Sequence, residues 1–86
     1  MVKNEMLEWA RKRLNSLSAE CTHFSETDRP VLASLSAAEF NGVADLLADL
    51  GYIVEPIEGV GKWALPDGTT VECKLVRIVE EELRQC

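Results

Sequence analysis

The sequence lacks the features that mark membrane-spanning and secreted proteins. It contains no uninterrupted apolar run near 18 residues, which argues against a transmembrane helix. Its first residues are amphipathic and lack the apolar core and cleavage site of a secretory signal. Three cysteines at wide spacings are an odd number and do not suggest a disulfide framework. We therefore expect a cytoplasmic protein with reduced thiols and no membrane association.

Histidine is also scarce, which limits metal-binding and catalytic chemistry. Cys21, His23, Cys73 and Cys86 are four potential zinc ligands, but none belongs to the close cysteine pair typical of a structural zinc site. His23 is the single histidine, and nothing in the sequence orients it toward a nucleophilic thiol. Whether these four residues meet in space is left open by the sequence. We predict no metal, no cofactor and no enzymatic activity.

A glycine-rich stretch, Gly59-Val60-Gly61-Lys62, superficially resembles part of a phosphate-binding loop. Such a loop needs a following helix whose N-terminus faces the phosphate. Here Trp63 and a proline turn follow instead, and Glu58 would repel an anion. We interpret the stretch as a glycine turn between two strands.

What the sequence does contain predicts an α+β fold in one domain, residues 1–86. Its 86 residues are 47% hydrophobic and 28% charged, an ordinary globular composition. Apolar residues at helical spacing (Leu7, Ala10, Leu14 and Leu17, widened by Met6 and Trp9) predict a helix over 3–17. Residues 18–35 are weakly patterned, and we expect an irregular segment with one helical turn.

The clearest helix signal covers residues 36–50. Ser36 and Glu39 match a capping box, and Gly51 stands where a helix commonly ends in a left-handed residue. Phe40, Val43, Leu47 and Leu50 give this helix one apolar face. All of the charged side chains of this predicted helix are acidic.

Three strands are expected after the helices, over residues 52–57, 62–65 and 69–75. Pro66-Asp67-Gly68 is a strong turn signal between the second and third strands. Val71, Cys73 and Leu75 alternate with polar residues, which places Cys73 on the inner face. The simplest arrangement is a three-stranded antiparallel meander. Residues 77–86 are interpreted as a short C-terminal helix or a frayed end.

The distribution of charge suggests a binding function. The net charge is −6, and residues 14–61 hold eight acids against the single Arg29, a net of −7. An acidic surface repels nucleic acid and attracts basic protein surfaces. We predict a non-enzymatic interaction module that binds a protein partner with a basic surface. Its predicted contact residues are Glu39, Asp45, Asp49, Glu55 and Glu58.

By size and charge, such a module fits the class of phage or mobile-element inhibitors that block a host nucleic-acid-binding protein, as anti-CRISPR proteins do. One alternative is a structural homo-oligomer, most simply a homodimer, assembled through Met6, Trp9 and a free strand edge. Another is a winged-helix regulator with the Pro66-Asp67-Gly68 hairpin as its wing. Residues 36–50 would then be the recognition helix, but they carry no base, so direct binding of nucleic acid is not expected.

Overall fold

The computed structural model describes residues 3–80, which form two helices followed by four strands. This confirms the α+β class with the helices first, but the strands form two separate two-stranded antiparallel sheets rather than a meander. The elements are α1 (Lys3–Glu26), α2 (Pro30–Asp49), β1 (Tyr52–Pro56), β2 (Gly61–Ala64), β3 (Thr70–Cys73) and β4 (Val76–Glu80).

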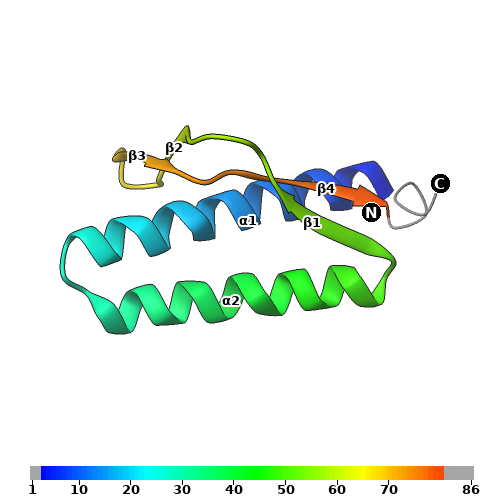
Figure 1. Ribbon diagram of the computed structural model, residues 1–86, viewed down its shortest axis with the longest axis horizontal. Helices are drawn as coiled ribbons and strands as arrows, with labels where there is room; N and C mark the ends of the chain where they lie inside the picture. The colour runs from blue at the N-terminus through cyan, green and yellow to red at the C-terminus, as the bar shows by residue number, and fades with distance from the viewer. Residues whose placement is uncertain (1–2, 81–86) are drawn as a thin grey trace.

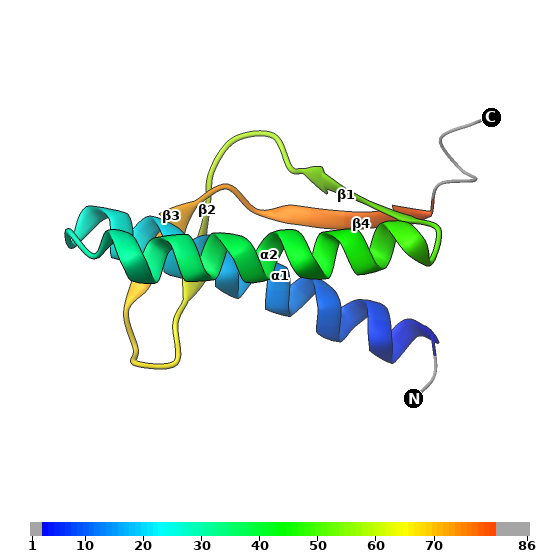
Figure 2. The same ribbon diagram turned by 90° about the horizontal axis from the view of Figure 1, so that it is seen from below.

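Helix α1 is the central element of the molecule. In Figure 1 it runs between α2 on one side and β2, β3 and β4 on the other, while β1 crosses from the end of α2, which it contacts. The two helices are antiparallel. Figure 2 shows that β4 crosses α1 obliquely, and that the β2–β3 hairpin lies near the C-terminal half of α1; β4 contacts α1, and β1 contacts α2. Both long sides of α1 are therefore covered by other elements.

The first helix is longer than the sequence pattern predicted. Residues 18–26 continue α1, and the expected irregular segment shrinks to a short turn before Pro30. Ala19 is fully buried against the strands, which provides the apolar contact that keeps this part of the helix in place. The helix ends where the backbone N–H of Thr27 donates to the carbonyl of His23 at 3.0 Å, followed by Asp28 at a φ of 58°. The prediction for residues 18–35 was wrong because burial outweighs a weak local pattern.

The second helix begins six residues earlier than the capping box predicted. It starts at Pro30, whose fixed φ and missing N–H suit the first helical position. Ser36 is an internal, buried residue of α2 and not its N-cap, and the Glu39 side chain binds Arg13 of α1 instead. Gly51 has a φ of 92° directly after the helix, so the predicted left-handed stop is confirmed.

The strand pairing differs from the meander because β1 pairs with β4. Tyr52 pairs with Glu80 and Pro56 with Val76, while Gly61 of β2 pairs with Cys73 of β3. Residues 76–80 are thus a strand, and the prediction of a terminal helix or frayed end over 77–86 was wrong for residues 77–80; residues 81–86 lie outside the described part. The alternating residues of β1 and β4 place Val54 and Ile78 on the face that packs against the helices.

The two sheets together form the legs of one long hairpin that is bent in the middle. Its tip is the predicted turn, in which Gly68 has a φ of 92° and the Thr69 N–H donates to Asp67 Oδ1 at 2.9 Å. At the bend, residues 57–60 on one leg lie opposite Lys74 and Leu75 on the other, so the strand ladder is interrupted there.

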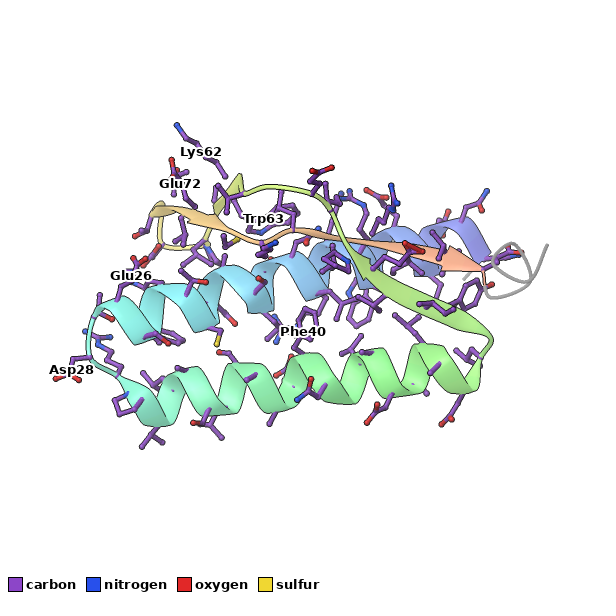
Figure 3. All side chains as sticks on the ribbon, in the orientation of Figure 1. Glu26, Asp28, Phe40, Lys62, Trp63 and Glu72 are labelled. Carbon is purple, nitrogen blue, oxygen red and sulfur yellow. The ribbon has the colours of Figure 1, made fainter. Side chains whose placement is uncertain are left out.

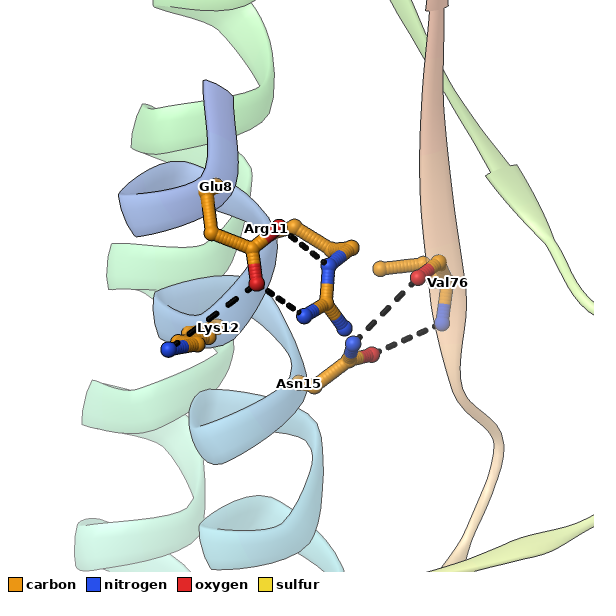
Figure 4. Close-up of polar contacts among 5 residues, drawn as sticks. All are labelled: Glu8, Arg11, Lys12, Asn15 and Val76. Atoms are coloured by element: carbon orange, nitrogen blue, oxygen red, sulfur yellow. Dashed lines mark hydrogen bonds and ion pairs between the residues drawn. The ribbon is translucent and has the colours of Figure 1, made fainter. Parts of the chain in front are cut away.

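Asn15 of α1 supplies hydrogen bonds next to this interruption. Its Nδ2 donates to the carbonyl of Val76 at 3.3 Å, and its Oδ1 accepts the N–H of Val76 at 2.7 Å (Figure 4). Ser18 donates to the Lys74 carbonyl at 2.7 Å, and the Trp63 indole N–H donates to Ser16 at 2.9 Å. Because buried backbone groups need partners, these side chains fix where the bent hairpin lies on α1.

Two apolar clusters lie on the two parts of α1. Leu14 and Leu47 are buried with Ala10 and Val76 where α1, α2 and β4 meet. Ala19, Leu65, Val71 and Cys73 form the second cluster under the β2–β3 hairpin. The predicted inner face of the β3 strand is confirmed, since Val71 and Cys73 are buried while Glu72 is exposed.

Replacing Asn15 with leucine tests the importance of its two hydrogen bonds. Asn15→Leu leaves the buried N–H and carbonyl of Val76 unpaired, and we expect a loss of about 2–4 kcal/mol in the free energy of unfolding. Urea denaturation measures it, with Asn4→Leu as a control because Asn4 is exposed on the same helix. A similar small change in both variants would contradict a structural role for Asn15.

Candidate protein-interaction surface

The five predicted contact residues do not form one continuous acidic surface. Glu39 accepts a hydrogen bond from Arg13 Nε at 2.8 Å, and Glu55 lies 3.6 Å from Arg77 on the neighbouring strand. Both carboxylates are therefore engaged in ion pairs within the chain. Glu58 belongs to the connection between β1 and β2, on the opposite side of α1 from α2 (Figure 1).

Asp45 and Asp49 are exposed on α2, as Glu39 is, but Glu39 is paired with Arg13. The two aspartates lie one helical turn apart and therefore on the same side of the helix. Within the described residues 3–80, neither takes part in an ion pair. Helix α2 carries Glu39 as its third charged side chain and no base. The acidic character predicted for this helix is thus concentrated in its C-terminal half.

The chain's own acids bind most of the arginines. Arg11 donates to Glu8 at 2.5 Å, Arg13 binds Glu39, and Arg77 binds Glu55, so three of the four arginines in residues 3–80 form ion pairs. The hydrogen bond from Arg11 also lowers the pKa of the Glu8 carboxyl. Figure 3 shows Lys62 and Glu72, cross-strand partners on β2 and β3, projecting together away from α1. The arginine charge is therefore mostly balanced by acids of the same chain, one of which, Glu39, belongs to α2.

A feature that the sequence reasoning missed is the apolar character of the outward side of α2. We call it the α2 strip. Four of its large side chains are more than half exposed, with exposed fractions of 72% for Val31, 62% for Leu35, 59% for Leu46 and 54% for Leu50. Leu50, predicted on the buried face, is therefore largely exposed. The strip consists of Val31, Leu35, Ala38, Gly42, Leu46 and Leu50.

A signal for the strip is present in the sequence but is easily overlooked. Phe40, Val43 and Leu47 already account for one apolar face of α2, and Phe40 points from α2 toward α1 in Figure 3. The remaining leucines and valine give the helix a second apolar side. By length and hydropathy alone, α2 also passes the test for a membrane-spanning helix, which core helices of soluble proteins and signal sequences pass as well.

The cysteine and histidine side chains are not assembled into a site in the described part of the chain. Cys21 lines a shallow cleft between α1 and α2, whereas His23 lines a different one beside Asp67. Cys73 is buried under the hairpin, and Cys86 lies outside the described residues. Residues 3–80 contain no group of three or more potential metal ligands.

Comparisons with known proteins add no assignment to this picture. No protein-family profile, no curated protein and no solved structure matches the chain.

The different environments of the two described cysteines predict different reactivity. Cys73 is 3% exposed, and burial raises the pKa of its thiol, which disfavours the reactive thiolate; its side chain is also less accessible than that of the half-buried Cys21. We expect iodoacetamide to modify Cys73 at least about tenfold more slowly than Cys21 in the native protein. Peptide mass spectrometry measures both rates, and the difference should vanish in urea. Equal rates in the native state would contradict the burial of Cys73.

Proposed function

We propose that this chain is a small acidic non-enzymatic interaction module that binds a partner protein with a basic surface. The observation that carries the proposal is the charge of α2, a long exposed helix with Asp45 and Asp49 on its outward half and no base anywhere along it. These two acids have no ion partner within residues 3–80 and are available to another molecule.

Charge complementarity supports this class of partner over nucleic acid. A phosphate backbone approaching α2 would meet carboxylates and no lysine or arginine. A protein that uses lysines and arginines to bind nucleic acid presents the opposite arrangement. The phage or mobile-element inhibitor class named above would act in this way, by covering the basic groove of such a protein.

The proposed contact set is narrower than the one predicted from the sequence. Glu39 and Glu55 contribute to the chain's own ion pairs, and Glu58 lies on the far side of α1 from Asp45 and Asp49. The proposal therefore assigns the primary contacts to Asp45 and Asp49, with Glu39 beside them on α2. Glu55 and Glu58 would be reached only by a partner that extends around the strands.

Charge reversal on α2 tests the proposal. The wild-type protein and the Asp45→Lys/Asp49→Lys variant serve as bait in affinity purification from the native host, and each captured protein is then purified and titrated separately. We expect at least one partner with a basic surface, whose affinity falls by about tenfold or more in the variant and falls with added salt. Nucleic acid should compete with the chain for that partner.

A matched control separates the position of the charges from their total. Glu5→Lys/Glu26→Lys makes the same change in net charge at two exposed positions on α1. This control should keep most of the affinity, and circular dichroism should show that both variants are folded. If both variants retain the same partners with the same affinity, the acidic side of α2 is not the binding surface.

A further inference from the structure

The α2 strip has nearly the same order of side-chain sizes from either end. Its members run large, large, small, small, large, large along the helix. Val31 and Leu50 lie 9.5 positions on either side of a midpoint between residues 40 and 41, and Leu35 and Leu46 lie 5.5 positions on either side of it. Such an order is self-complementary for two antiparallel copies of the helix, because each large side chain then faces another large one.

The small residues at the middle of the strip have no explanation within the chain. A Cβ atom at Gly42 would meet no other atom within 4 Å. Glycine inside a helix is destabilising relative to alanine, and no turn, positive φ or close contact in this chain requires it there. Together with the exposed Ala38, Gly42 leaves room for the backbone of another helix to approach closely.

The charges on α2 favour the antiparallel orientation over the parallel one. Asp45 and Asp49 lie in the C-terminal half, whereas Arg29 and the positive end of the helix dipole lie at the N-terminus. Parallel pairing would bring four carboxylates together. Antiparallel pairing separates the two acidic pairs and places each near the Arg29 end of the other copy.

We propose that the α2 strip is the interface of a homodimer, formed by antiparallel pairing with the α2 strip of a second copy. The two-fold axis would cross α2 at the level of residues 40 and 41 along the helix. Leu35 of one copy would then pack against Leu46 of the other. No described element extends beyond α2 on this side of the molecule (Figure 1). The paired α1–α2 hairpins make a four-helix arrangement with the strands on its outside.

This inference concerns the same side of α2 as the proposed function, but the two fail separately: Leu46→Glu tests the dimer, and Asp45→Lys/Asp49→Lys tests the contact with a basic partner. Asp49 follows Val31 by 18 residues, five full helical turns, and so lies on the same side of α2 as the strip, whereas Asp45 lies about 40° to one side of Val31. The dimer would therefore cover Asp49, near the Arg29 end of the other copy, and would compete with a basic partner for this side of α2. A single helix face buries less than the roughly 800 Å² per partner of a standard interface, so we expect a micromolar dissociation constant.

The first experiment measures the mass of the purified protein in solution. Analytical ultracentrifugation from low to high micromolar concentration should show the 9.6 kDa chain passing to a species of twice that mass. Leu46→Glu should weaken the dimer on the order of 100-fold, because each dimer loses two buried leucines, while the monomer stays folded. A wild-type protein that remains monomeric at high micromolar concentration overturns the proposal. Binding of this monomer to lipid vesicles through α2 would show that a membrane surface, and not a second copy, covers the strip.

The matched control for Leu46 is Trp9, which is also more than half exposed but lies on α1. Trp9→Glu should leave the dimer intact. If Trp9→Glu dissociates the dimer and Leu46→Glu does not, the interface lies on α1 and the α2 proposal is wrong.

A second variant makes stability and assembly change in opposite directions. Gly42→Leu should raise the melting temperature at concentrations where the protein is monomeric, since leucine favours helix and meets open space there. The same change should weaken the dimer by preventing close approach of the helices. A Gly42→Leu protein that dimerises as well as the wild type contradicts the proposed crossing.

Cross-linking tests the orientation of the two helices. In a background with Cys21 and Cys86 changed to serine, a mixture of Leu35→Cys and Leu46→Cys proteins is treated with a short bis-maleimide. Antiparallel pairing predicts efficient cross-links between the two different variants and few within Leu35→Cys alone. The opposite pattern would indicate parallel pairing and overturn the proposal.

Discussion

The hydrogen bonds between Asn15 and Val76 are the constraint on which the arrangement of the strands depends. The long hairpin is interrupted at its bend, and the backbone of Val76 is buried there. A carboxamide can donate and accept at the same time, so Asn15 provides both bonds that an adjacent strand would provide. Ser18 and Ser16 hold the neighbouring Lys74 and Trp63 in the same way. These side chains seat the hairpin at one position on α1.

The placement of the hairpin determines which surfaces the molecule exposes. Helix α1 is covered by strands on one side and by α2 on the other, so Ala10, Leu14 and Leu17 of this helix are buried. Helix α2 contacts α1 and β1, and the α2 strip faces outward. The exposed strip, with Asp49 on the same side of α2, is thus a consequence of a chain too short to cover both helices.

The local signals that proved reliable are those in which backbone geometry admits few alternatives. Gly51 and Gly68 both adopt the positive φ expected of them, and the alternation of Val71 and Cys73 correctly identified the inner face of β3. Sequence signals that more than one local structure can satisfy were less reliable. The Ser36 capping box is unused because Pro30 already provides a good helix start, and the β-branched residues 76–80 became a strand because β1 offered a partner.

The sequence by itself determined the α+β class, the two helices, the turn at the hairpin tip and the acidic, base-free character of α2. These properties depend on residue type and near-neighbour spacing. Only the tertiary structure decided that β1 pairs with β4, that Arg13 and Arg77 bind two of the predicted contact acids, and that one of the two apolar sides of α2 faces outward. Those outcomes depend on contacts between residues far apart in the chain, where several pairings satisfy the same local pattern and burial selects among them.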